Sequence, residues 1–154
     1  SAAHPRGQPP GAAQQRPHAR QELGQAEGGI PIGCVIVYKG TVIGRGHNRR
    51  VQRQSAILHA EMDALENAGR QPAVVYREST LYTTLSPCAM CTGAILLYGI
   101  RRIVIGENLT FLGEEELLRS RGVGIQVLQD PTCRELMSRF ITRRPELWNE
   151  DIGV

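Results

Sequence analysis

Two cysteines three positions apart, together with a histidine and a glutamate upstream of them, are the residues best suited to chemistry. Cys88 and Cys91 lie in the stretch PCAMC, and His59 and Glu61 lie in the stretch HAE. Two thiolates and one imidazole form a three-ligand set for Zn²⁺, which leaves the fourth tetrahedral position open for water. A carboxylate beside that water can accept and return its proton. The pattern predicts a catalytic zinc site with Glu61 as the proton shuttle.

The specificity of this signal comes from the combination of the two motifs. A lone C-x-x-C occurs in redox proteins, and H-x-E alone carries little information. H-x-E followed by a strand and then P-C-x-x-C at a helix start is the pattern of zinc deaminases. Two alternatives stay open. A structural zinc site would take a fourth ligand such as Cys34, Cys133 or a second histidine, and a redox dithiol would need neither His59 nor Glu61.

The elements that must position these residues follow from periodicity and from stop signals. The helix that carries Cys88 and Cys91 is expected to have Ser86 as its N-cap and Pro87 as its first helical residue. Helices are expected over residues 17–27, 59–68, 87–98, 114–121, 130–142 and 145–148, and strands over 32–38, 41–46, 80–84, 102–106 and 124–128.

This alternation of strands and helices favours an α/β fold, with one sheet covered by helices on both faces. Residues 1–20 are rich in Pro, Gly, Gln, Ala and Arg and have almost no large apolar side chains. Such a segment cannot bury enough surface to offset its ordering entropy. We therefore expect a disordered segment over 1–20 and a single domain over 21–154.

Composition and charge exclude several classes of protein. No run of 18 apolar residues is present, so no membrane span is expected. The net charge is +3, but the arginines are scattered, and Arg49, Arg50 and Arg53 are interpreted as a solvated loop. The sequence also lacks the interleaved aromatic residues that stack bases, so nucleic acid is not an expected partner. We expect a cytoplasmic protein, with the nucleus as an additional location.

Several stretches beyond the metal motif resemble one family. GRGHNRR, LHAEMDALENAGR, LYTTLSPCAMCTGAILLYGI and the tail WNEDIG are similar to the fungal cytosine deaminases, within the cytidine deaminase-like superfamily. The resemblance runs from about Gly28 to Gly153. It implies a three-layer α/β/α sandwich around a mixed five-stranded sheet, one catalytic zinc ion per chain and a homodimer. It also implies hydrolysis of free cytosine to uracil and ammonia in pyrimidine salvage.

The resemblance also implies roles for individual residues. It assigns the metal to His59, Cys88 and Cys91 and the proton transfer to Glu61. Substrate contacts are implied for the Asn48 amide, the backbone N–H of Ala60, the carbonyl of Ser86 and the Asp151 carboxylate. Apolar residues are implied to cover or line the base, namely Phe111, Trp148, Ile152, Ile32 and Leu85.

Two departures from the family pattern stand out. Ala60 replaces the usual glycine between the ligand histidine and the glutamate, and polar residues occupy the apolar face of the first helix. HAEM and PCAMCTGAI are also close to tRNA adenosine deaminases. A tRNA adenosine deaminase or a guanine deaminase built on the same site is therefore the alternative. A non-catalytic zinc-stabilised binding module is a further one, although the presence of Glu61 argues against it.

Overall fold

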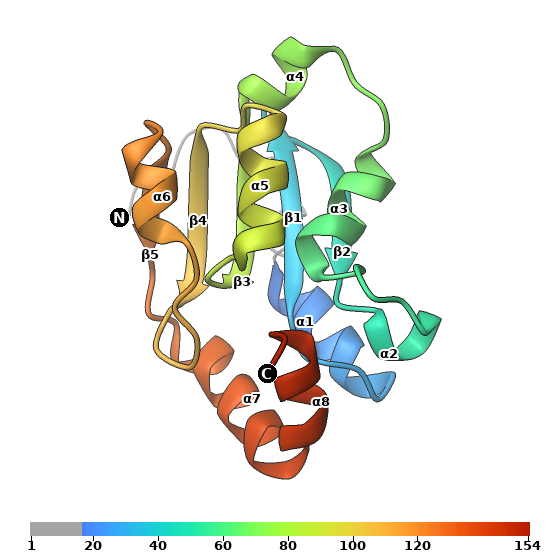
Figure 1. Cartoon of the computed structure of the whole chain (residues 1–154). Coiled ribbons are helices and arrows are strands. Elements are labelled where there is room, and N and C mark those ends of the chain that lie inside the picture. Colours follow the sequence, from blue (N-terminus) through green and yellow to red (C-terminus); the bar gives the residue numbers. More distant parts are fainter. Residues whose placement is uncertain (1–16) are drawn as a thin grey trace, which may run out of the picture.

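A mixed five-stranded sheet forms the middle layer of the computed structural model, which describes residues 17–154 (Figure 1). The order of the strands is β2-β1-β3-β4-β5. β1 pairs antiparallel with β2 and with β3, whereas the β3–β4 and β4–β5 pairs are parallel. This topology confirms the predicted α/β fold with a mixed sheet. The strands are β1 (Gly33–Tyr38), β2 (Thr41–His47), β3 (Ser79–Leu85), β4 (Arg102–Glu107) and β5 (Gly124–Val127).

The helices include all those expected from the sequence and two short ones that were not predicted, α2 and α4. Both short helices lie in connections, and neither is long enough to show a helical period in the sequence. The helices are α1 (Pro17–Ala26), α2 (Arg50–Arg53), α3 (Ala60–Ala68), α4 (Ala73–Arg77), α5 (Ala89–Leu97), α6 (Glu115–Ser120), α7 (Pro131–Arg143) and α8 (Pro145–Asp151).

Helices cover both faces of the sheet, and glycines let two of them approach the strands closely. A Cβ on Gly46 of β2 would lie 2.3 Å from the backbone nitrogen of Ala64 in α3. A Cβ on Gly33 of β1 would lie 2.2 Å from the carbonyl of Pro17 in α1. Gly46 pairs with Cys34, the residue after Gly33, so the two glycines face opposite sides of the sheet. α3 and α1 therefore belong to different outer layers, and Figure 1 shows α5 beside α3.

The hydrophobic core includes the buried side chains of the central strands. Ile36, Leu81 and Ile105 are fully buried on three neighbouring strands, and Ile95 of α5 packs with them in one cluster. Cys34 is also fully buried, as expected for a small core residue. Among residues 17–154, no helix has the length and apolar character needed to cross a bilayer.

Three sequence-based expectations need correction. α5 begins at Ala89 with Cys88 as its N-cap, rather than with Ser86 as N-cap and Pro87 as first residue. Residues 17–20, placed in the disordered segment, form the first turn of α1, and residues 1–16 lie outside the described part of the chain. Arg49 and Arg50 do not lie in a solvated loop, because their side chains are only 23% and 13% exposed.

Candidate active site

Two helix N-termini meet at the carboxyl end of β3 and carry the predicted metal ligands. His59 is the N-cap of α3, and Cys88 is the N-cap of α5, with Cys91 in the first turn of that helix. The start of a helix presents free N–H groups and a positive dipole end, which stabilise thiolates and carboxylates. The fold therefore brings the three donors together from positions far apart in the sequence.

The three donor atoms have the spacing of a metal site. His59 Nδ1 lies 3.4 Å from Cys88 Sγ and 3.8 Å from Cys91 Sγ, and all three atoms lie within 4.8 Å of one another. A tetrahedral zinc ion with its usual bond lengths would separate a nitrogen ligand from a sulfur ligand by about 3.6 Å. Both nitrogen–sulfur distances therefore fit a zinc ion held by His59, Cys88 and Cys91.

The charges around these donors suit a divalent cation. Hydrogen bonding from Cys91, assisted by His59 and opposed by burial, lowers the pKa of Cys88 to about 4. Burial alone would lower the pKa of His59. The contact with Cys88 and the negative charges of Asp151 and Glu61 outweigh burial and raise that pKa to about 9. A surplus of negative charge thus surrounds the imidazole.

Glu61 is held against the metal ligands by strand β3. Its carboxylate is buried and accepts a hydrogen bond of 2.5 Å from the Thr83 hydroxyl. Burial raises the pKa of Glu61, and hydrogen bonds from Cys91 and Thr83 partly oppose that rise. A carboxyl group whose pKa is raised above its ordinary value is suited to accept a proton and return it. Thr83 was not identified from the sequence, although it shares a strand face with Leu81 and Leu85.

Asp151 connects the C-terminal helix to the imidazole and to Asn48. Its Oδ1 lies 3.5 Å from His59 Nε2 and accepts a hydrogen bond of 2.8 Å from Asn48 Nδ2. Burial raises the pKa of Asp151, while the charges of His59 and Arg50 and the bond from Asn48 oppose that rise. Arg50 Nη1 lies 3.6 Å from the same carboxylate. Arg50 was missed as a site residue, because its charge was attributed to the surface.

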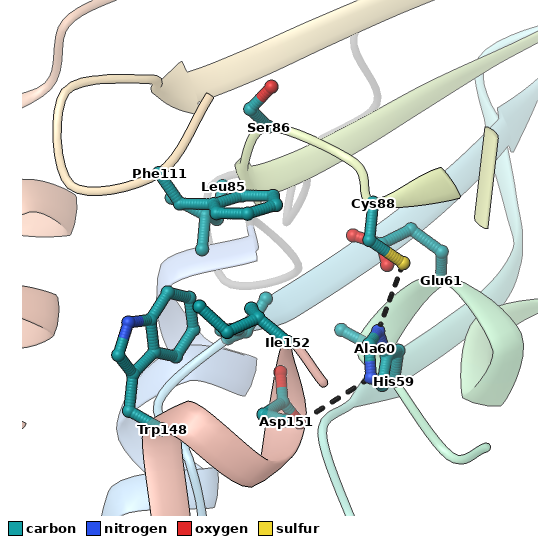
Figure 2. Close-up of a pocket in the computed structure, with 11 residues that line it drawn as sticks. His59, Ala60, Glu61, Leu85, Ser86, Cys88, Phe111, Trp148, Asp151 and Ile152 are labelled. Carbon is teal, nitrogen blue, oxygen red and sulfur yellow. Dashed lines mark hydrogen bonds and ion pairs between the residues drawn. The ribbon is translucent and has the colours of Figure 1, made fainter. Parts of the chain in front are cut away.

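A small pocket opens in front of the ligands, and two aromatic side chains form its outer wall (Figure 2). The Phe111 and Trp148 rings meet edge to face, with centroids 5.8 Å apart and an interplanar angle of 85°. Trp148 lies on α8, and Phe111 lies in the loop after β4. The residues that line the pocket are Ile32, His59, Ala60, Glu61, Leu85, Ser86, Cys88, Phe111, Trp148, Asp151 and Ile152.

The lining contains every predicted site residue except Asn48 and Cys91. Asn48 is fully buried and donates to Asp151, which does line the pocket. Cys91 is fully buried behind the other two ligands. The structure therefore gathers the predicted residues in one place, and Asn48 and Cys91 contact residues that line the pocket.

Ser86 and the loop that carries Phe111 are fixed by buried acidic residues that the sequence did not reveal. The Ser86 hydroxyl donates to Glu115 Oε2 at 2.6 Å and accepts from the backbone N–H of Gly113 at 2.9 Å. Glu107 accepts from the backbone N–H groups of Leu109 and Thr110 at 2.7 and 2.9 Å. These bonds hold the loop between β4 and α6 in place, and with it the position of Phe111.

A second group of potential metal ligands lies between α1 and α7. His18 Nε2 is 3.1 Å from Cys133 Sγ and 3.2 Å from Asp130 Oδ2. Burial raises the pKa of Cys133 to about 12, with smaller contributions from Asp130 and Glu107. These contacts join α1 to the N-terminal end of α7, and none of the three residues lines the pocket.

The comparisons with known proteins agree with this geometry. A family model described as "Cytidine and deoxycytidylate deaminase zinc-binding region" matches residues 13–107. A cytosine deaminase of Candida albicans is 60% identical over 129 residues, which cover 83% of this chain and 86% of that protein. A tRNA-specific adenosine deaminase of Streptococcus pyogenes is 45% identical over 102 residues, 64% of this chain and 62% of that protein.

Solved structures show the same fold. A structure from a study of tRNA:A34 deaminases has a TM-score of 0.67 at 24% identity and covers 80% of this chain and 96% of that one. A structure from a study of guanine deaminase from Nitrosomonas europaea has a TM-score of 0.59 at 25% identity. It covers 92% of this chain and 98% of the other.

Proposed function

This chain belongs to the zinc-binding cytidine and deoxycytidylate deaminase family, and from that premise we propose that it hydrolyses free cytosine to uracil and ammonia. The observation that carries the proposal is the 60% identity to a cytosine deaminase along most of both chains. The pocket supports it, since Phe111, Trp148 and Asp151 line a space next to the metal ligands. The geometry suits a small planar base.

His59, Cys88 and Cys91 would hold the zinc ion. When bound, zinc supplies a Lewis acid that makes a water molecule reactive at neutral pH. The chain's own contribution to the hydrolysis is the movement of protons by Glu61. Its carboxylate takes a proton from the attacking water and delivers one to ring nitrogen N3 as oxygen bonds to C4. It then takes the remaining proton from the new C4 hydroxyl and passes it to the exocyclic nitrogen, and the C4–N4 bond breaks to release ammonia as the C4=O bond of uracil forms.

The buried polar groups would orient the base for this attack. Asn48 gives one amide hydrogen to Asp151, which leaves its second hydrogen for the pyrimidine carbonyl O2. The backbone N–H of Ala60 would donate to the same oxygen. The Ser86 carbonyl would accept from the exocyclic amine, and Asp151 would contact the polar edge of the base. Phe111, Trp148 and Ile152, with Ile32 and Leu85, would exclude water.

A side-by-side assay tests the substrate. Cytosine, cytidine, guanine and adenosine are each incubated with the zinc-loaded protein, and ammonia release is measured. We expect ammonia from cytosine in large excess over the other three. Reaction of only guanine or an adenosine substrate would favour the alternative indicated by the tRNA deaminase and guanine deaminase relatives. No release from any substrate would favour a non-catalytic zinc protein.

We also propose that the chain forms a homodimer through α5. That helix (AMCTGAILL) contains no charged residue, and its outward positions Ala89, Gly93 and Leu97 recur every four residues. Leu97 is 73% exposed. An exposed apolar helix face is typical of a surface that a second copy covers. Light scattering after gel filtration should give twice the chain mass, and Leu97→Glu should give a monomer. A monomeric parent protein would contradict the proposal.

A further inference from the structure

We infer that Asp63 is a positioning residue that sets the place of Asn48 relative to Glu61, and so governs how tightly the base is bound. The inference rests on the proposed function for the role of Asn48. Asp63 does not line the pocket and takes no part in the proton transfer. Its carboxylate instead binds His47 and Arg49, the two neighbours of Asn48 in the sequence.

The Asp63 carboxylate binds the residue on each side of Asn48. Oδ2 accepts from the backbone N–H of His47 at 3.1 Å. Oδ1 accepts from Arg49 Nε at 3.1 Å and from Arg49 Nη2 at 2.6 Å. The Asp63 side chain is only 2% exposed, so these charge-assisted bonds are formed away from water. The chain segment that carries Asn48 is thus held at two points by one side chain.

These hydrogen bonds matter because Asn48 directly follows the last residue of β2. The ladder between β1 and β2 stops at the pair Gly33–His47. Asn48 then makes one further backbone bond, from its N–H to the Ile32 carbonyl at 2.9 Å. Beyond that point the sheet no longer fixes the chain. The Asp63 carboxylate holds this segment together with one backbone bond, from the Arg49 N–H to the Leu58 carbonyl at 2.9 Å.

The same helix carries Asp63 and the catalytic groups. Asp63 follows Ala60 and Glu61 within α3, and a helix holds such neighbours at fixed separations. β2 also contacts this helix directly, since a Cβ on Gly46 would lie 2.5 Å from the Ala60 carbonyl. Holding Asn48 to Asp63 therefore fixes the distance from the group that binds O2 to the group that moves protons.

Two variants and a control test the inference. Asp63→Asn removes the charge but keeps an acceptor for one partner, and Arg49→Gln leaves the His47 bond in place. The exposed Glu66 of the same helix offers a control variant, Glu66→Gln. KM, kcat and zinc per chain are measured for each, with whichever base of the substrate panel reacts.

We expect Asp63→Asn to raise KM about tenfold, the factor associated with one lost charge-assisted hydrogen bond. Its kcat should fall less than about threefold, and zinc should remain at one ion per chain. Arg49→Gln should give a smaller rise in KM, and combining both changes should add little to Asp63→Asn alone. Glu66→Gln should match the parent.

Other outcomes overturn the inference. An unchanged KM in Asp63→Asn, with only a lower melting temperature, would show that the carboxylate serves stability alone. A fall in kcat with zinc loss would show that it supports the ligands instead. The identity of the reacting base in the parent protein tests the proposed function separately, so the two failures are distinguishable. If Asp63→Asn does not fold, a KM unchanged in Arg49→Gln still overturns the inference.

Discussion

Asn48 and Asp151 are joined by a buried hydrogen bond of 2.8 Å, although 103 positions separate them in the sequence. This bond links the end of β2 to the C-terminal helix α8. Because Asp151 also faces His59, the bond connects the proposed base-binding amide with the metal-binding imidazole.

Replacing Glu61 by Gln should abolish turnover while the metal remains bound. The amide keeps the shape of the side chain and can still contact Thr83, but it cannot carry a proton. The loss of a general acid–base group typically costs roughly 10²–10⁴-fold in rate. Zinc content by mass spectrometry and steady-state kinetics measure the two effects together. Loss of zinc from this variant would show instead that Glu61 supports the metal.

Replacing Phe111 by Leu should weaken binding of the base more than it slows the chemistry. The change removes the edge-to-face contact with Trp148, and such contacts contribute about 0.5–1.5 kcal/mol. We expect a rise in KM of roughly two- to tenfold. Leu112→Ala, a change at an exposed position in the same loop, is the control. Equal effects in both variants would argue against a specific role for the aromatic pair.

Removing the α8 helix after Glu146 should cripple activity but leave the zinc ligands intact. The truncated chain lacks Trp148, Asp151 and Ile152, while His59, Cys88 and Cys91 remain on α3 and α5. Retained cobalt or zinc binding with little turnover is the expected result. Asp151→Asn provides a milder version if the truncated chain does not fold. Full turnover in both would show that the helix does not complete the site.

Stripping the metal with a chelator should expose one reactive thiol. Without the metal, Cys88 has a pKa of about 4, so it is a thiolate at pH 6 and above. Cys34 and Cys133 are buried, and burial raises the pKa of each well above its usual value. Peptide mapping after brief alkylation at pH 6 should find label mainly at Cys88. The metal-loaded protein should be protected, and labelling of Cys133 first would contradict this assignment.

Weakening the N-cap of α7 should lower stability without affecting the site. Asp130 accepts bonds from the backbone N–H groups of Thr132 and Cys133 at 2.8 and 3.2 Å, and Asp130→Ala leaves both without that partner. The expected loss is about 1 kcal/mol in the free energy of unfolding, or roughly 2–4 °C in Tm. Thermal unfolding measures the loss of stability, and steady-state kinetics measure KM. A change in KM would connect α7 to the pocket.

The sequence predicted the strands, the long helices and the metal ligands because each depends on local patterns. The α5 boundary was placed too early because Ser86 and Pro87 satisfy the usual cap preferences, whereas Ser86 instead hydrogen-bonds Glu115. The roles of Arg49 and Arg50 could not be predicted. Their partners, Asp63 and Asp151, are brought near by the fold rather than by sequence spacing.

Because local patterns carry the prediction, some pocket residues could be identified only through the family resemblance. His59, Glu61, Cys88 and Cys91 form a recognisable pattern by type and spacing. Phe111, Trp148 and Ile152 are ordinary apolar residues, and nothing in their own surroundings in the sequence separates them from the core. Only the folded chain shows that Phe111 and Trp148 meet over the pocket.

The close contact of β2 with α3 through Gly44 and Gly46 has a consequence for engineering. A Cβ at either position would collide with the backbone of α3, so this half of the site tolerates almost no remodelling. Phe111 and Trp148 belong to segments that meet through the edge-to-face contact of these two rings. Attempts to widen the range of accepted heterocycles should therefore vary the aromatic half and leave the glycine-packed half as it is.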